Sequence, residues 1–576
     1  MNQRIHYRLI LLLILCGLLT GCAAKQLASP TPLSATATTV RPTISLPTLT
    51  PSLVPLSLEP PIGYSWWNRD VFYEIFVRSF FDSNGDGIGD FNGITDKLDY
   101  LNDGDPGTTS DLGVNGIWLM PIFPSPSYHG YDVTDYQAVN PDYGTLDDFK
   151  RLLEEAHKRD IRIILDLPLN HTSDQHPWFQ QSLDPNSTYR DYYIWSDTDP
   201  GYLGPWKEDV WHEGPNGGYY YGVFVAEMPD LNYNNPAVVE EMDKIVKFWL
   251  DQGVDGFRLD GARYIVEEGQ KQADTPATHA YYQHLNETVK GINPQALLLG
   301  EVWTDDFTVS TYTKSDQLDL AFDFDLANGM VTSANNGQNN KATNALNFTK
   351  KLFPQGQSAP FLTNHDQDRV MSQLGGDVDK AKNAAAMLLS APGVPFVYYG
   401  EEIGMSGKRG AEDNDIQRRL PMQWSAEANA GFTTGEPWTP LYPFYSATNV
   451  AYQTSQPDSM LSFYRDWIHL RNEHPALLFG DTFIIESSDP AVYAVLRSGS
   501  GEGILALINL SDQPVTDYKL ILSSGPLKGA YTLEPLYGEG QFAEIQSNPQ
   551  GGFENYQPLP TLPANSRYLL QLQPTN

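Results

Sequence analysis

The chain has 576 residues, of which 41% are hydrophobic and 12% aromatic, enough apolar material for a large buried core. Its 71 acidic residues outnumber its 37 basic residues, so the formal net charge is −34. Nucleic-acid binding needs a surplus of Lys and Arg on one face, so we expect no nucleic-acid partner. This balance suits a soluble enzyme outside the cytoplasm that acts on an uncharged substrate.

The first 22 residues have the pattern of a secretion signal. Basic residues precede an apolar run over residues 9–19, and the tetrad Leu-Thr-Gly-Cys ends at Cys22. The run is shorter than the roughly 20 residues that a membrane-spanning helix needs. The tetrad resembles the bacterial lipoprotein signal, in which the cysteine becomes the acylated N-terminus; an ordinary cleaved signal with an incidental cysteine is the alternative. We therefore expect Cys22 to carry a lipid that anchors the chain to a bacterial cell membrane.

Residues 23–62 are rich in Pro, Ser and Thr and nearly free of charge. Such a segment cannot bury a core and favours extended conformations, so it predicts a spacer between membrane and folded domain. The two cysteines are Cys16 and Cys22. Cys16 would leave with the signal and Cys22 would carry the lipid, so we expect no disulfide in the mature fold.

Eight apolar runs of strand length recur along the chain, with amphipathic helical stretches such as 146–158 and 236–252 between several of them. The runs are 71–76, 116–120, 161–167, 254–259, 296–299, 318–324, 360–362 and 395–399. Buried strands with crossover helices predict an α/β fold, a parallel (β/α)8 barrel over residues 63–169 and 229–474. In that fold, chemistry takes place at the carboxyl ends of the strands.

Two further regions depart from the barrel pattern. Residues 170–228 are irregular, rich in Trp, Tyr, Pro and Gly and too long for an ordinary loop, so they predict an inserted domain B after strand 3. Beyond residue 475 the chain changes to short alternating runs separated by Gly and Pro. This pattern predicts a C-terminal antiparallel β-domain, a β-sandwich over residues 475–576.

Carboxylates lie at the ends of four predicted strands, in the motifs DLPLNH from Asp166, GFRLD ending at Asp260, GEVW with Glu301, and NHD ending at Asp366. Strand alternation puts Arg258 and Asp260 on the same side. An Arg beside an Asp keeps it ionised, which suits a nucleophile. Two carboxyls about 5–5.5 Å apart, one ionised and one with a raised pKa, are the requirement for retaining glycoside hydrolysis. Salt bridges at the barrel mouth are the alternative for any single strand, but four such ends favour a functional site.

In order and spacing, these motifs resemble the conserved regions of the α-amylase superfamily, glycoside hydrolase family 13, as does MPDLN over residues 228–232. The resemblance covers residues 66–576. It implies a retaining α-glycosidase with Asp260 as nucleophile, Glu301 as general acid and base, and Asp366 as a third carboxylate that grips the sugar hydroxyls. No organic cofactor is expected. The substrate-binding residues that the resemblance implies are Tyr131, His129, His171, Arg258, His365, Arg263 and Arg419. Zinc ligation by the histidines is the poorer alternative, since no HExxH or paired CxxC motif is present.

The segment DSNGDGIGD over residues 82–90 places oxygen-bearing side chains at alternate positions between glycines. Such spacing suits Ca²⁺, although Gly93 replaces the Glu of an EF-hand. Similar loops bind Ca²⁺ in the oligo-1,6-glucosidase and neopullulanase branches of the family; a plain Asn/Asp/Gly turn is the alternative. We expect a structural calcium site with the ligands Asp82, Asn84, Asp86, Asp90 and the carbonyl of Ile88.

The signals for specificity are mixed. MPDLN resembles the neopullulanase-like and intermediary branches, whereas GEEIG over 400–404 and RLPMQW over 419–424 resemble the oligo-1,6-glucosidase and trehalose-synthase branch. The combination fits the intermediary subfamily and implies an α-amylase that hydrolyses internal α-1,4 bonds of starch and maltooligosaccharides. We separately expect the protein to be a monomer. The alternatives are an α-glucosidase, oligo-1,6-glucosidase or transglycosylase acting on short α-glucans and, more remotely, a non-catalytic glycan-binding lipoprotein.

Overall fold

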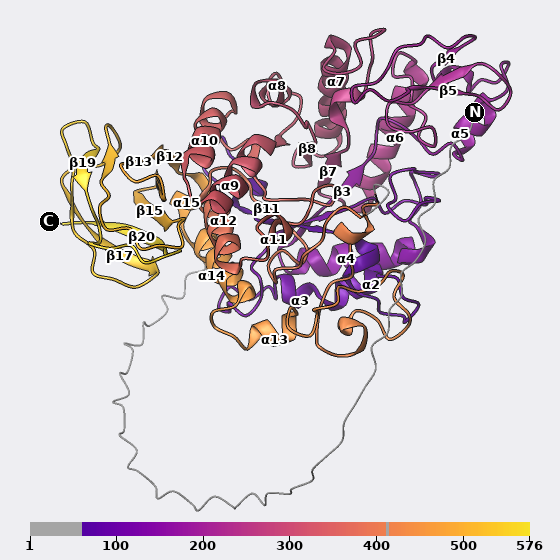
Figure 1. The fold of residues 1–576 in the computed structure, drawn as a ribbon. Coiled ribbons are helices and arrows are strands. Elements are labelled where there is room, and N and C mark those ends of the chain that lie inside the picture. The colour runs from indigo at the N-terminus through magenta and orange to yellow at the C-terminus, as the bar shows by residue number, and fades with distance from the viewer. Residues whose placement is uncertain (1–59, 411–413, 576) are drawn as a thin grey trace, which may run out of the picture. The chain divides into compact units, whose positions relative to one another are not determined.

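The computed structural model of the protein describes residues 60–410 and 414–575 (Figure 1). The predicted signal with Cys22, and the predicted spacer up to residue 59, lie outside the described residues. Among the described residues, no helix combines the length and apolar character needed to cross a bilayer. The first element is the 3-10 helix η1 (Trp66–Arg69), a few residues beyond the predicted start of the fold.

Eight parallel strands form the central sheet, as the sequence predicts. They are β1 (Phe72–Ile75), β2 (Gly116–Leu119), β3 (Arg162–Leu167), β7 (Gly256–Leu259), β8 (Leu297–Gly300), β9 (Leu320–Phe322), β10 (Ser358–Ala359) and β11 (Phe396–Tyr398). Their order is β10-β9-β8-β7-β3-β2-β1-β11, and a parallel bridge between Phe361 and Phe396 joins the two edges. The sheet therefore closes into a (β/α)8 barrel.

The predicted seventh strand needs a correction, because β10 ends before residue 360. Pro360 has no N–H to donate to a ladder, so regular pairing stops there. The chain still runs alongside β11, since the Phe396 N–H donates to the Pro360 carbonyl at 2.9 Å. The apolar run 360–362 is thus the continuation of a very short strand.

Helices fill the connections between the strands and continue to the end of the barrel. They are α1 (Val77–Phe80), α2 (Phe91–Asp96), α3 (Leu98–Leu101), α4 (Leu146–Lys158), α6 (Pro236–Gln252), α7 (Pro276–Ile292), α8 (Asp306–Tyr312), α9 (Phe324–Asn336), α10 (Asn340–Leu352), α11 (Val370–Gln373), α12 (Val378–Ser390), α13 (Val450–Thr454), α14 (Met460–Glu473) and α15 (Pro475–Phe479). Helices α4 and α6 coincide with the predicted ranges because their ends carry strong local signals. Thr145 forms a capping box before α4, and α6 begins with Asn235 and Pro236 and ends at the left-handed Gly253.

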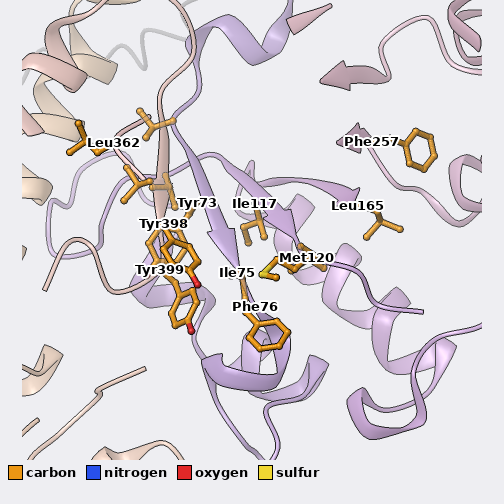
Figure 2. Packing of buried hydrophobic residues seen from close by; sticks show 14 of the residues in the cluster. Tyr73, Ile75, Phe76, Ile117, Met120, Leu165, Phe257, Leu362, Tyr398 and Tyr399 are labelled. Atoms are coloured by element: carbon orange, nitrogen blue, oxygen red, sulfur yellow. The ribbon is translucent and has the colours of Figure 1, made fainter. Parts of the chain in front are cut away.

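Alternate strand residues build two apolar layers. Ile117, Leu165 and Phe257 point outward into the large core under the helices (Figure 2). Their neighbours Trp118 and Ile164 belong to a separate cluster inside the barrel. Since Phe257 points outward, the next residue, Arg258, points into the barrel, as the strand period predicts.

Between β3 and α6 the inserted segment forms a small antiparallel sheet in the order β4-β6-β5. Its elements are α5 (Pro177–Ser182), the 3-10 helix η3 (Arg190–Tyr192), β4 (Trp195–Ser196), β5 (Trp211–Glu213) and β6 (Tyr219–Tyr221). Aromatic rings provide most of its packing; for example, Phe179 stacks on Trp195 with ring centroids 5.8 Å apart. The aromatic side chains of this segment thus mainly form its hydrophobic core.

The C-terminal region consists of two antiparallel sheets that share one apolar core. The strands are β12 (Asp481–Ile484), β13 (Glu486–Ser487), β14 (Val492–Gly499), β15 (Glu502–Asn509), β16 (Leu520–Leu522), β17 (Ala530–Tyr537), β18 (Ile545–Gln546), β19 (Phe553–Tyr556) and β20 (Arg567–Pro574). Arg497 on β14 is buried and donates to the carbonyls of Ser390 and Ala391, at the end of α12, at 3.0 and 2.8 Å. These bonds satisfy carbonyls that a helix end leaves unpaired and tie the region to the barrel.

Candidate active site

The polar side chains that the sequence places at strand ends meet at the carboxyl end of the barrel. Arg258 lies on β7 and is fully buried, Asp260 directly follows β7, and Glu301 directly follows β8. Arg258 Nη1 donates to Asp260 at 2.6 Å, and its Nη2 lies 2.9 Å from Glu301 Oε2. One guanidinium therefore holds both carboxylates next to each other.

Asp166, at the end of β3, anchors this guanidinium from the other side. Arg258 Nη1 donates to both oxygens of Asp166, at 2.9 and 3.0 Å. The Trp118 indole N–H donates to Asp166 at 3.2 Å, and the Arg258 guanidinium lies 5.0 Å from the Trp118 ring centroid. Arg258 is thus held mainly through Nη1, which donates to Asp166 and Asp260, while the Trp118 ring favours its charge.

Glu301 is a carboxyl group suited to carry a proton, as is the fully buried Asp166, whose pKa burial raises to about 7 although Arg258 lowers it. Burial raises the pKa of Glu301, Arg258 lowers it, and the nearby negative charges of Asp260 and Asp366 raise it again, to a value of about 7. Oxygen Oε2 accepts a hydrogen bond from the Gly261 N–H at 3.0 Å. At neutral pH and below, this side chain can donate a proton to a bound oxygen.

Asp366 and His365 form a second charged group across the site. The His365 ring lies between two carboxylates, with Nδ1 2.6 Å from Glu74 and Nε2 3.1 Å from Asp366. Although burial lowers the pKa of His365, these carboxylates raise it to about 10. Burial likewise raises the pKa of Asp366, but His365 and Arg419 lower it well below its usual range. Asp366 is therefore an ionised acceptor, held by Arg419 Nη2 at 2.9 Å.

Tyr131 lies between the two charged groups. Its hydroxyl is 3.0 Å from Asp166 and 2.8 Å from His365 Nε2, and its ring stacks on the His365 ring at 5.5 Å between centroids. His171 contacts the Tyr131 carbonyl through Nε2, at 3.2 Å, and its buried Nδ1 has no hydrogen-bond partner among the described residues. His129 accepts from the Tyr131 N–H, and burial lowers the pKa of His129 to about 4, so it is neutral. All three predicted residues thus lie at one site.

Arg263 differs in its surroundings from the other predicted substrate-binding residues. Its Nε and Nη2 donate to Asp274 at 3.1 and 2.6 Å, and its Nη1 donates to the Trp303 carbonyl at 3.0 Å. The hydrogen bonds of the Arg263 guanidinium therefore link two loops beside the site, one that contains Asp274 and one that contains Trp303. A direct contact between Arg263 and substrate remains a prediction.

Three residues of this site are absent from the set that the sequence analysis proposed: Glu74, Trp118 and Asp166. Asp166 opens the DLPLNH motif and is therefore visible in the sequence, but the motif does not indicate that its side chain binds Arg258. Glu74 is the one charged residue in the apolar run 71–76, which is a detectable anomaly in a buried strand. Trp118 looks like an ordinary core residue, and its indole N–H gives no signal in the sequence.

The predicted calcium loop folds as a series of tight turns. Asp82 accepts from the N–H groups of Gly85 and Gly87 at 2.7 and 2.8 Å, and Asp90 accepts from Ser83 at 2.9 Å. Within residues 60–410 and 414–575, no group of three or more His, Cys, Asp or Glu side chains is placed to hold a metal ion. The hard oxygen donors of the loop suit Ca²⁺ chemically, but their backbone bonds equally describe the plain turn. Calcium binding therefore stays a prediction.

A buried carboxyl group with a raised pKa, next to a second carboxylate paired with an Arg, has the composition of a retaining glycosidase site. Its position at the carboxyl ends of barrel strands is where enzymes of this fold carry out chemistry. Fold and site together define a glycoside hydrolase built on a (β/α)8 barrel.

Comparison with known proteins identifies the family. Residues 74–480 match the model of the α-amylase catalytic domain. Alpha-amylase 3 of Dictyoglomus thermophilum is 40% identical over 460 residues, covering 78% of this chain and 86% of that protein. An oligo-1,6-glucosidase of Parageobacillus thermoglucosidasius is 34% identical over 522 residues, covering 78% and 91%. The crystal structure of an α-amylase from H. orenii superimposes with a TM-score of 0.76 at 43% identity, covering 88% of this chain and 99% of that one.

The chain therefore belongs to the α-amylase family, glycoside hydrolase family 13, and is a retaining glycoside hydrolase that acts on glucans. The relatives differ in activity, so the bond it cleaves and the length of its substrate need a separate argument.

The alkaline limb of the pH profile should report Glu301. Because the pKa of this acid is raised to about 7, the carboxyl group is protonated below that pH and loses its proton above it. A general acid must be protonated, so we expect kcat/KM on maltooligosaccharides to fall as the pH rises through about 7. With α-maltotriosyl fluoride, whose leaving group needs no proton, the limb due to leaving-group protonation should be absent. Identical alkaline limbs for both substrates would contradict the assignment.

Proposed function

We propose that Asp260 is the nucleophile, Glu301 the general acid and base, and Asp366 the group that binds the sugar hydroxyls. Glu301 protonates the leaving oxygen while Asp260 attacks the anomeric carbon and forms a glycosyl ester. Glu301, now ionised, removes a proton from water, which breaks the ester and releases the sugar with its configuration retained. The shared contact with Arg258 supports this division, because it brings both carboxylates to one place.

We further propose that the substrate is an α-1,4-glucan and that the enzyme is an endo-acting α-amylase. The observation that carries this proposal is a pocket of about 370 Å³, lined among others by Phe324, by Trp303, which follows Glu301 by two residues, and by Gln367, which follows Asp366 directly. Trp303 is 46% exposed and its ring stacks on Phe324 with centroids 4.6 Å apart. Such a surface offers room and an apolar face for sugar units on the leaving side.

A second candidate is an α-glucosidase that removes one glucose at a time. Behind Asp366, Arg419 is only 4% exposed and lies 5.8 Å from the Tyr128 ring, which in turn stacks on Trp438. A wall at this side of the site would limit the donor to a single glucose unit. The oligo-1,6-glucosidase relative also supports this candidate.

The deciding experiment is the product profile over time on soluble starch and on maltotriose, with the anomeric configuration followed by NMR. Early release of mixed maltooligosaccharides in the α-configuration supports the endo-acting α-amylase. Release of glucose alone, faster from maltotriose than from starch, would replace it with the α-glucosidase. No product from either substrate would contradict both and favour a glycan-binding protein or another linkage.

We propose a structural Ca²⁺ ion in the loop 82–90, supported by the alternation of oxygen donors along it. A ligand that binds only the folded state raises its stability, so chelation should lower Tm by a few degrees, about 2–5 °C. Thermal melts with and without a chelator test this, with Asp86→Ala as the matched variant that should lose the response. An unchanged Tm in the original protein on chelation would reject the calcium site.

We propose that the chain is exported and held at a bacterial membrane through a lipid on Cys22. Residues 1–22 alone support this, by their signal pattern. The mass of the mature N-terminal peptide tests it, since an unmodified peptide, or one that begins at another residue, would contradict the lipid anchor.

A further inference from the structure

Trp206 of the inserted segment is a large apolar side chain held in water, 56% exposed. It lies at the tip of a tight hairpin closed by a bridge between Leu203 and Asp209 and by a hydrogen bond from the Gly204 N–H to the Glu208 carbonyl at 2.8 Å. Because the base of the hairpin is fixed, the indole is presented on a rigid support rather than on a loose loop.

A contact from the barrel fixes this hairpin in place. The buried side chain of Gln272 donates to the Leu203 carbonyl at 3.1 Å. Gln272 belongs to the loop between β7 and α7, whose first residue is the proposed nucleophile Asp260. The position of Trp206 is therefore tied to the catalytic end of the barrel.

Two aromatic residues connect Trp206 to the catalytic centre. Its ring stacks on Phe224, with centroids 5.7 Å apart and an interplanar angle of 28°, and lies 5.4 Å from the Tyr264 ring. Phe224 covers Gly261 so closely that a Cβ on Gly261 would lie 2.9 Å from its ring. Gly261 itself donates its N–H to Glu301 at 3.0 Å. Three contacts, through Phe224 and Gly261, thus connect Trp206 to the proposed general acid.

The side on which Trp206 lies follows from the chemistry of Glu301. A general acid protonates the oxygen of the departing sugar, so that sugar lies on the Glu301 side of the cleavage point. Tyr264 ends the 3-10 turn η4 (Ala262–Tyr264), and Arg263 in the same turn binds the Trp303 carbonyl at 3.0 Å. Trp206 through its ring and Trp303 through its carbonyl therefore both contact this one turn, which follows Asp260 in the chain.

We propose that Trp206 is a platform for a glucose unit on the leaving side of the cleaved bond, so that the inserted segment sets the preference for long chains. The proposal rests on the α-glucan-cleaving function proposed above and deepens it. The C–H face of a glucose ring is apolar and matches the exposed indole face, whose contact with water it would replace. If Trp206 only packed over Phe224 and Tyr264, its substitution would leave the preference for long chains unaffected.

The test compares two substrates that differ in what occupies the leaving side. Maltoheptaose places sugar units there, whereas α-maltotriosyl fluoride places only a fluoride ion, so the ratio of their kcat/KM values isolates leaving-side binding. In Trp206→Ala we expect this ratio to fall at least about tenfold, and in Trp206→Phe, which keeps one aromatic ring, by less. Phe348→Ala is the matched control, because Phe348 is also 56% exposed but lies on α10.

Each outcome decides one question. A ratio within twofold of the original in Trp206→Ala would overturn the platform. A proportional loss on both substrates, with a lower Tm, would assign Trp206 to packing and also overturn it. If the unaltered enzyme hydrolyses the fluoride but no maltooligosaccharide, the proposed function fails, and that result is independent of any Trp206 variant.

Discussion

Asp260→Asn and Glu301→Gln are each expected to lower kcat on starch by at least about a thousandfold while the fold stays intact. Asparagine cannot form the glycosyl ester, and glutamine can neither protonate the leaving oxygen nor activate water. Initial rates together with thermal melts measure the effect. Asp251→Asn is the matched control, since Asp251 pairs with Lys247 on the surface of α6, at 2.7 Å.

Substrate chemistry separates the two roles. With α-maltotriosyl fluoride the leaving group needs no acid, so Glu301→Gln should still form the glycosyl ester and accumulate it, whereas Asp260→Asn should not. Added azide can attack that ester without a general base and should restore turnover in Glu301→Gln, giving the α-glycosyl azide. Either variant retaining a tenth of the original activity on starch would remove that residue from the mechanism.

Arg258→Leu has the second large expected effect, because Arg258 contacts Asp166, Asp260 and Glu301 together. Removing a partner from a buried charged group costs about 3–5 kcal/mol, so we expect a lower Tm as well as a loss of kcat of about a thousandfold or more. Arg258 lowers the pKa of Glu301. The residual activity should therefore show its alkaline limb above pH 7.

Arg258→Lys keeps the prediction testable if the leucine variant does not fold. Lysine retains the charge but cannot bridge three carboxylates with one planar group, so its loss of kcat should be smaller and its alkaline limb should move less. An unshifted alkaline limb in both variants would show that Arg258 acts by packing alone. The pH profile thus distinguishes an electrostatic role from a structural one.

Local signals explain why much of the fold could be predicted. The bounds of α4 and α6 follow from caps next to the apolar periodicity, and these lie within a few residues of each helix end. The seventh strand starts earlier than the sequence predicts, because its pairing with β9 begins at Ser358, before the apolar run, and Pro360 interrupts the ladder. Strand position depends on partners distant in sequence, which the run itself does not specify.

The same distinction applies to the site. Asp260, Glu301 and Asp366 could be found from their motifs, whereas the contact of Glu74 with His365 joins residues 291 positions apart. Arg263, whose contact with substrate stays a prediction, pairs with Asp274, a partner that no motif indicates. A motif identifies chemistry but does not show which neighbours a side chain meets.

The sequence by itself determined the barrel, the carboxylates at its strand ends and the side of β7 on which Arg258 and Asp260 lie, because strand alternation and motif spacing are local properties of the chain. Only the tertiary structure decided that Arg258 contacts both Asp260 and Glu301, that His365 lies between two carboxylates, and that Trp206 packs against Tyr264. These contacts arise from barrel closure and from the docking of the inserted segment, which bring distant residues together through many weak packing contacts. No single stretch of sequence encodes the sum of those contacts.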